Sequence, residues 1–277
     1  MPHLEVPGAS LHHEIAGSGP LLLCISGGDG TTEIWSGFAE VLRDRFTVVS
    51  YNRRGFGRSY LNDAQDYSQR LETDADDAAL LIKHLSPSDP ATLIGNSSGA
   101  VVTLKLLVRH PGLIRTAISY EPPLARVLPD FDDLWAMHES IYATYRASGP
   151  FAAYDRFGEL TKTQMNGGMV RQWMQTSPYV WANIQYWFER EFMTYPQAEF
   201  DVAGELAPLK EKLVLFNGVL SAKEAYQCRG NVALGEKLGI EVVEVMGEHT
   251  GHRTHAKEFG EKLVKVLEAR NDFYAEL

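Results

Sequence analysis

A serine stands between two glycines where a short apolar run gives way to a helical pattern. The run covers residues 91–94, the helical pattern covers 98–110, and between them the chain is Gly95-Asn96-Ser97-Ser98-Gly99. A turn this tight strains the backbone of its central residue, and side chains two positions to either side would collide, so glycine is needed at both flanks. The segment predicts a strand, a sharp turn and a helix, with Ser97 standing clear at the helix N-terminus.

Strand and helix patterns alternate along most of the chain. Other apolar runs predict strands at 10–15, 20–25, 46–51, 114–120, 213–216 and 240–245. Helical spacing predicts helices at about 34–42, 71–85, 223–238 and 254–269. This alternation predicts an α/β fold with a mostly parallel, doubly wound sheet.

One segment interrupts the alternation. Residues 122–210 are helical in character and rich in aromatic side chains. We expect a helical lid of these residues, inserted after the sixth strand and packed over one end of the sheet. The core α/β domain then consists of residues 1–121 and 211–277.

Composition limits the partners. The net charge of −10 and the lack of a dense Lys/Arg cluster disfavour nucleic acid and anionic membranes. No apolar run approaches a membrane span, and the first residues lack a secretory signal. Cys24 and Cys228 form no disulfide framework, which suits a reducing compartment. We expect a cytoplasmic monomer or homodimer that acts on a small molecule, with no nucleic-acid partner and no membrane partner.

The serine turn matches Gly-x-Ser-x-Gly, which between a strand and a helix indicates an activated nucleophile. Ser97 is the candidate. Ser98 is a weaker one, because its flanks would be Asn96 and Ala100. The Ser98 amide is positioned to help hold an oxyanion in the reaction.

A serine nucleophile needs a base. Three histidines follow the final strand, and His249 lies in the loop directly after it, where an imidazole can reach the serine turn. His252 is the rival, whereas His255 belongs to the start of the last helix. Their spacing also permits a metal site, but no Asp or Cys ligand lies nearby, so we expect no metal and no other cofactor.

The base needs an acid to fix its tautomer. No acid follows the strand at 213–216 until Glu224. Glu121, by contrast, stands at the carboxyl end of the strand at 114–120, on the same sheet edge as the serine turn. Glu121 is the candidate acid, and Glu224 is more easily explained as an exposed helical residue.

The whole chain resembles the α/β-hydrolase family. Gly27-Gly28-Asp29-Gly30 is similar to the family's oxyanion loop, so the resemblance implies that the amide of Gly28 or of Asp29 joins that of Ser98. Residues 52–59 resemble the family's Asp-x-Arg-Gly-x-Gly-x-Ser turn, with Asn52 in place of the aspartate. We interpret that turn as architecture.

A closer resemblance is to the zearalenone lactonases and related small serine hydrolases. Their Ser-Ser-Gly-Ala turn is matched at 97–100, their triad glutamate at Glu121 and their Gly-x-His loop at 247–249. Their Val-Trp-Ala lid segment, in which the tryptophan contacts substrate, is matched at 180–182. The resemblance implies that Trp181 contacts substrate.

Together these features predict a serine hydrolase with Ser97, His249 and Glu121 as its triad, acting on an ester or lactone. The aromatic lid predicts a bulky apolar or aromatic substrate. The expected substrate contacts are Trp181, Tyr186, Trp187 and Phe188. C–C or thioester cleavage, cofactor-free cyclisation or isomerisation, and a slow ligand receptor remain alternatives, because fold and triad do not fix the reaction.

Overall fold

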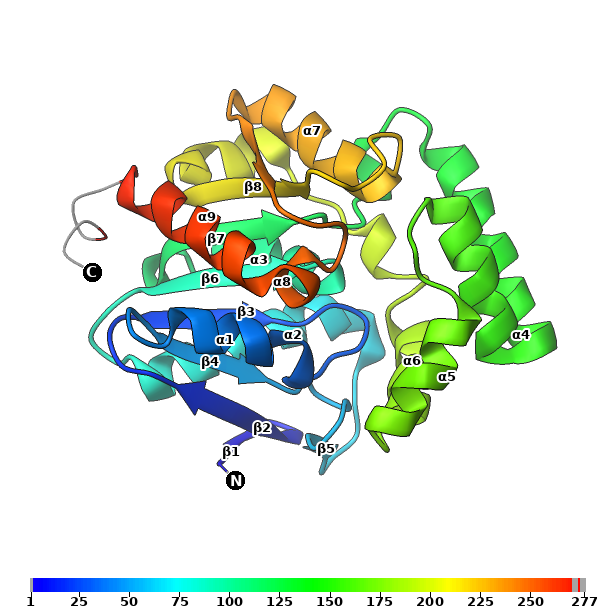
Figure 1. Ribbon diagram of the computed structural model, residues 1–277, viewed down its shortest axis with the longest axis horizontal. Coiled ribbons are helices and arrows are strands. Elements are labelled where there is room, and N and C mark those ends of the chain that lie inside the picture. The colour runs from blue at the N-terminus through cyan, green and yellow to red at the C-terminus, as the bar shows by residue number, and fades with distance from the viewer. Residues whose placement is uncertain (1, 271–273, 275–277) are drawn as a thin grey trace.

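The strands of the chain pair into one large sheet (Figure 1). The computed structural model describes residues 2–270 and 274. Within them the sheet has nine strands: β1 (His3–Val6), β2 (Ala9–Ala16), β3 (Leu21–Ile25), β4 (Thr47–Tyr51), β5 (Tyr60–Leu61), β6 (Ala91–Asn96), β7 (Ile114–Tyr120), β8 (Leu213–Gly218) and β9 (Val242–Val245). The order is β1-β2-β4-β3-β6-β7-β8-β9, and β5 pairs with β2.

The sheet is parallel from β4 to β9, and β1, β2 and β5 add antiparallel pairs at one edge. Every residue of β3, β6 and β8 is buried. Strands covered on both faces have no solvent side, which explains why their sequences are mainly apolar. The predicted mostly parallel, doubly wound α/β architecture is confirmed.

Helices cover both faces of the sheet. Their bounds are α1 (Ser36–Leu42), α2 (Arg70–Leu85), α3 (Ser98–Arg109), α4 (Phe131–Thr161), α5 (Gly167–Thr176), α6 (Val180–Arg190), α7 (Tyr226–Leu238), α8 (Gly251–Thr254) and α9 (Ala256–Glu268). Phe38 of α1 and Leu263 of α9 pack in the core on one face, whereas Leu81 of α2, Leu104 of α3 and Leu234 of α7 pack in the core on the other. None of the described helices is long and apolar enough to cross a membrane.

Helices α4, α5 and α6 stand beside the sheet, at the right of Figure 1. They share an aromatic cluster of their own, which includes Tyr154, Phe157 and Phe188. The long α4 is broken at Gly149, which has a positive φ of 80° and precedes Pro150. A proline lacks the amide that an unbroken helix requires, so the chain bends here.

Two short edge strands were not predicted. β1 has four residues, only one of them buried, and β5 has two, so neither contains an apolar run of strand length. With β1 and β5 both counted, the helical segment follows the seventh strand of the structure, β7, and not the sixth as expected.

A buried cluster of charged residues ties the helical segment to the sheet. Arg53, which follows β4, donates to both oxygens of Glu191 at the end of α6, at 2.6 and 2.8 Å, and to Asp74 of α2 at 2.8 Å. Arg70 adds a bond of 3.1 Å to Glu191, and Tyr195 donates to Asp74 at 2.6 Å. The Arg53 and Glu191 side chains have no exposed surface. A buried charge needs such partners to offset its lost hydration.

Replacing Glu191 with alanine should therefore lower the free energy of unfolding sharply. The substitution leaves Arg53 and Arg70 facing Asp74 alone, and breaking a buried pair in this way costs about 3–5 kcal/mol. Urea unfolding followed by circular dichroism measures the loss. The control is Glu40→Ala, which removes a pair with Arg43 whose side chains are 49% and 70% exposed and costs about 0–1 kcal/mol. Equal small losses in both variants would contradict this account.

Candidate active site

The serine turn is built as its sequence requires. Ser97 joins β6 to α3 with φ 53° and ψ −123°, a backbone conformation that residues other than glycine rarely adopt. A Cβ added at Gly95 would lie 2.2 Å from the Gly99 carbonyl oxygen, and one at Gly99 would lie 2.1 Å from that of Ile25. Only glycine fits at either flank, so the tight packing of the turn against β3 fixes the position of Ser97.

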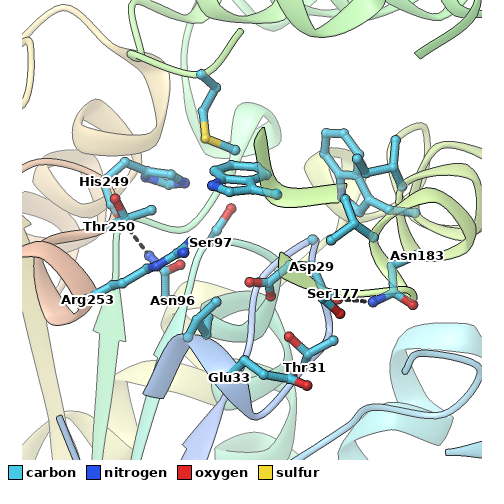
Figure 2. Close-up of a pocket in the computed structure, with 18 of the residues that line it drawn as sticks. Asp29, Thr31, Glu33, Asn96, Ser97, Ser177, Asn183, His249, Thr250 and Arg253 are labelled. Atoms are coloured by element: carbon cyan, nitrogen blue, oxygen red, sulfur yellow. Dashed lines mark hydrogen bonds between the residues drawn. The ribbon is translucent and has the colours of Figure 1, made fainter. Parts of the chain in front are cut away.

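Glu121 and His249 come together across the sheet edge. Glu121 directly follows β7 with φ 47° and is 1% exposed. Its Oε2 lies 2.7 Å from Nδ1 of His249, which stands in the loop after β9. His249 and Ser97 both line the same pocket, and Figure 2 shows their side chains directed toward the same part of it. The structure thus brings together the three side chains predicted for the triad.

The other carboxylate oxygen of Glu121 is held by the last residue of β8 and by the loop that follows. It accepts hydrogen bonds from the Gly218 amide at 2.8 Å and the Ser221 hydroxyl at 2.6 Å, and the Cys228 thiol lies 3.4 Å away. Burial raises the pKa of Glu121, but the hydrogen bond and charge of His249, with the Ser221 and Gly218 donors, outweigh it and leave the pKa below its ordinary value. Glu121 is therefore a carboxylate at neutral pH.

The loop that carries His249 is fixed at several points. Asn96, which precedes the serine, donates to the His249 carbonyl at 2.8 Å (Figure 2). The Tyr120 hydroxyl donates to the Glu248 carbonyl and accepts from the Gly251 amide at 3.2 Å. Residues beside both Ser97 and Glu121 thus hold the imidazole loop, which limits its movement relative to them.

The rival residues lie in less suitable places. Ser98 is buried as the first residue of α3 and does not line the pocket, and Glu224 is exposed. His252 lines the pocket but is fully buried, with its ring 4.1 Å from that of Trp35. Burial, followed by repulsion from His249 and Arg253, lowers the pKa of His252 to about 3. His255 has its Nδ1 2.9 Å from the Thr254 hydroxyl.

The glycine-rich loop lies against the serine. A Cβ at Gly27 would come within 3.0 Å of the Ser97 Cβ, and one at Gly28 within 2.7 Å of the Trp187 indole nitrogen. Arg53 donates to the carbonyls of Ser26 at 2.9 Å and of Gly27 at 2.7 Å, which holds the loop from below. Within the described chain, the amides of Gly28, Asp29 and Ser98 have no hydrogen-bond acceptor. All three remain candidates for holding an oxyanion.

The pocket over Ser97 has a cavity of about 130 Å³. The helical segment covers it with mostly apolar side chains: Tyr154, Phe157, Met165, Trp173, Val180, Ile184 and Trp187. The sheet side contributes the glycine-rich loop, Asn96 and Ser97. A mainly apolar cavity with a few polar groups is typical of small-molecule sites.

Of the four side chains predicted to contact substrate, Trp187 lines this pocket and the other three do not. Trp181 is 40% exposed. Tyr186 packs 5.0 Å from the Phe56 ring and accepts a bond from Arg70 at 3.2 Å, and the Phe188 ring stacks 4.4 Å from that of Tyr145. The prediction is corrected here, because these three residues lie on other faces of α6.

The pocket-facing side of α6 has a regular spacing that the sequence contained. Val180, Asn183, Ile184 and Trp187 recur at i, i+3, i+4 and i+7, which places them on one face of a helix. Tyr154 and Phe157 of α4 share an (i, i+3) relation. Helical periodicity in this segment indicates which residues share a face, whereas the number of aromatic residues alone does not.

No cluster of three or more His, Cys, Asp or Glu side chains in residues 2–270 and 274 is placed to hold a metal ion.

Comparison with known proteins identifies the family. The family described as the alpha/beta hydrolase fold matches residues 20–158. The uncharacterized hydrolase YraK of Bacillus subtilis (strain 168) is 32% identical over 268 residues, which cover 96% of this chain and 95% of that protein. The fold is also similar to that of the enol-lactonase from Burkholderia xenovorans LB400, with a TM-score of 0.69, 19% identity, and coverage of 96% of this chain and 99% of that one. A carboxylesterase structure from the Thaumarchaeon Nitrososphaera gargenis gives a TM-score of 0.74 at 18% identity, covering 97% and 98% of the two chains. The chain belongs to the α/β-hydrolase family.

Proposed function

We propose that this hydrolase of the α/β-hydrolase superfamily is a serine esterase or lactonase that cleaves a bulky apolar or aromatic small molecule. The observation that carries the proposal is the 2.7 Å contact between His249 Nδ1 and buried Glu121, in a pocket that Ser97 also lines. A serine, a histidine and a carboxylate are the parts that this kind of acyl transfer requires.

The mechanism follows from the contacts of the histidine. Glu121 is ionised and accepts the Nδ1 proton of His249, which leaves Nε2 free to take the proton of the Ser97 hydroxyl. The Ser97 oxygen attacks the substrate carbonyl and forms a tetrahedral intermediate. His249 then returns the proton to the leaving alcohol as the carbon–oxygen bond breaks. Water, activated by His249 in the same way, hydrolyses the resulting acyl-enzyme.

The oxyanion of each tetrahedral intermediate needs donors. The Ser98 amide, together with that of Gly28 or Asp29, supplies them in this proposal, because these amides have no other acceptor in the described chain. Loss of one such donor costs about 3–4 kcal/mol in transition-state stabilisation. The hydrogen bonds from Arg53 to the Ser26 and Gly27 carbonyls fix the position of this loop beside the cavity.

A substrate panel tests the proposal. The purified protein is assayed with p-nitrophenyl esters of increasing acyl size, aromatic lactones and thioesters, each beside Ser97→Ala. We expect turnover of esters and lactones that requires Ser97 and favours bulky aromatic acyl groups over acetate. Turnover of thioesters alone, or ester cleavage that survives in Ser97→Ala, would contradict the proposal.

Substitutions in α6 test which face meets the substrate. Trp187→Ala should lower kcat/KM for a bulky aryl ester or macrolactone about 10-fold or more, since lost apolar complementarity is worth roughly 1–3 kcal/mol. The change for p-nitrophenyl acetate, which cannot fill the pocket, should be small. Trp181→Ala is the matched control, because its side chain is 40% exposed and lies outside the pocket.

Thermal melting accompanies these kinetics, because Trp187 also packs in the aromatic cluster of the helical segment. A general loss of packing would lower activity on both substrates together. If kcat/KM for the bulky substrate fell selectively in Trp181→Ala and not in Trp187→Ala, the substrate would contact the Trp181 face of α6, against our proposal.

A further inference from the structure

One carboxyl group in the pocket has no place in the mechanism above. Asp29 follows Gly28 in the glycine-rich loop, lines the pocket and is half-buried. Its Oδ1 is shielded from solvent and has no hydrogen-bond partner in the described chain. Figure 2 shows the carboxyl group projecting from the loop toward the side of the pocket where Ser97 stands. A carboxyl group with an unsatisfied oxygen is costly beside an apolar pocket, which suggests that the group serves a bound molecule.

The main chain of Asp29 is fixed, whereas its Oδ1 has no hydrogen-bond partner among the described residues. Asn183 of α6 donates to the Asp29 carbonyl at 3.0 Å (Figure 2), and the Gly30 amide closes the turn onto the Gly27 carbonyl at 3.0 Å. Rigid placement of the loop fixes where the carboxyl group stands. A binding group held in place loses little entropy when a ligand arrives.

The charged groups around Asp29 define what it can accept. Arg53, below the loop, is committed to Glu191 and Asp74. Arg253 of α8 and Glu33 both line the pocket, and the Tyr154 hydroxyl of α4 is also within electrostatic range of Asp29. Glu33 is paired with Arg58 at 3.7 Å, and Arg253 offsets the charge of Asp29, so little net charge is left to bind a ligand ion. A neutral donor does not need that net charge.

We propose that Asp29 is a specificity-determining residue that accepts a hydrogen bond from a hydroxyl group of the substrate, an alcohol or a phenol, close to the scissile carbonyl. The hydroxyl lies close to that carbonyl because Asp29 adjoins Gly28, whose amide is a candidate for the oxyanion site. This inference rests on the proposed function and narrows its substrates to hydroxylated esters or lactones.

Burial raises the pKa of Asp29 to about 6, although the charges of Arg53 and Arg253 and the Thr31 amide oppose the rise and Glu33 adds to it. Above that pH the group is an anionic acceptor, and below it the group becomes protonated. The preference for a hydroxylated substrate should therefore be full at pH 8 and decline as the pH falls through about 6. A ratio between two substrates isolates this effect, because any pH dependence of the shared catalytic steps affects both substrates alike.

The experiment compares matched p-nitrophenyl esters with and without one hydroxyl: phenylacetate, mandelate and 3-hydroxyphenylacetate. In the wild type we expect kcat/KM for the better hydroxylated ester to exceed that for the parent about 10-fold or more, as a hydrogen bond to a charged group allows. Asp29→Ala should bring this ratio close to one, and Asp29→Asn should reduce it and remove its pH dependence. Glu33→Gln, at the other carboxylate of the pocket, should keep the ratio.

Two further readouts keep the outcomes distinct. Melting temperature separates binding from structure: Asp29→Ala should melt no lower than the wild type, since removing an unsatisfied carboxylate removes a cost. Calorimetry on Ser97→Ala with the corresponding amides measures the hydroxyl preference without turnover. Absence of Ser97-dependent ester cleavage would count against the proposed function alone. A ratio that is the same in the wild type and Asp29→Ala, in kinetics and in binding, would overturn the role of Asp29.

Discussion

Replacing Ser97 with alanine is expected to lower kcat on any ester substrate by about 10⁶-fold and to abolish labelling by a fluorophosphonate probe. The reason lies in the turn that carries it. The strained backbone at φ 53° holds the hydroxyl at the N-terminus of α3, in the pocket that His249 also lines. Removing the hydroxyl removes the atom that forms the acyl-enzyme, and alanine adds no bulk to the turn.

Peptide mapping of the labelled wild type provides the decisive control. The adduct should lie on Ser97, and Ser98→Ala should still take the label, because the Ser98 side chain is buried outside the pocket. An adduct on Ser98 would overturn the assignment. Melting temperatures of both variants exclude a general loss of structure as the cause.

The core of the fold was predictable because its signals are local. A fully buried strand such as β3 must be apolar at nearly every position, and the helix that follows β6 must begin at a glycine-flanked turn. Each requirement is met within a few neighbouring residues. The helices α2 and α3 begin and end within a residue of the predicted positions for the same reason.

The helices of the helical segment were harder to predict, because their orientation depends on contacts with residues that are distant in the sequence. The pocket-facing side of α6 is set partly by Glu191, whose partners Arg53 and Arg70 lie far away in the sequence. Asn183 is a second example, since its amide reaches the Asp29 carbonyl. The resemblance of residues 180–182 to a lactonase lid segment pointed to Trp181, but a short sequence match does not say which face of α6 meets the cavity, and Trp181 lies outside it.

Glu121 could be predicted from the sequence as the candidate acid, but the groups that hold it could not. Its candidacy followed from its place at the end of a strand and from the lack of an acid after β8. Its supporting donors could not be predicted, since Gly218 and Ser221 reach it from about a hundred residues further along the chain. In the structure the end of β8 and the loop after it supply hydrogen-bond donors to a carboxylate that follows the neighbouring strand, β7.

Those donors make Glu121→Gln a severe substitution, with an expected loss in kcat of about 10⁴-fold, as for loss of a triad acid elsewhere. The Gly218 amide and the Ser221 hydroxyl both donate to the Oε1 position, so they will hold the carbonyl oxygen of the new amide there. Its NH₂ group must then point at Nδ1 of His249, 2.7 Å away in the wild type. Only an unprotonated Nδ1 accepts that bond, which moves the imidazole proton to Nε2 and leaves no base for Ser97.

The tautomer and the rate can be measured together. Nitrogen NMR of His249 should show the proton on Nδ1 in the wild type and on Nε2 in Glu121→Gln at neutral pH. Glu224→Gln is the matched control, because its exposed side chain lies outside the pocket, and we expect its kcat to stay within about twofold of the wild type, as for most exposed substitutions. The opposite pattern, with Glu224→Gln inactive and Glu121→Gln active, would return the acid to the segment after β8. An unchanged tautomer with a large loss of rate would instead mean that Glu121 acts through its negative charge, stabilising the imidazolium, and not by orienting the ring.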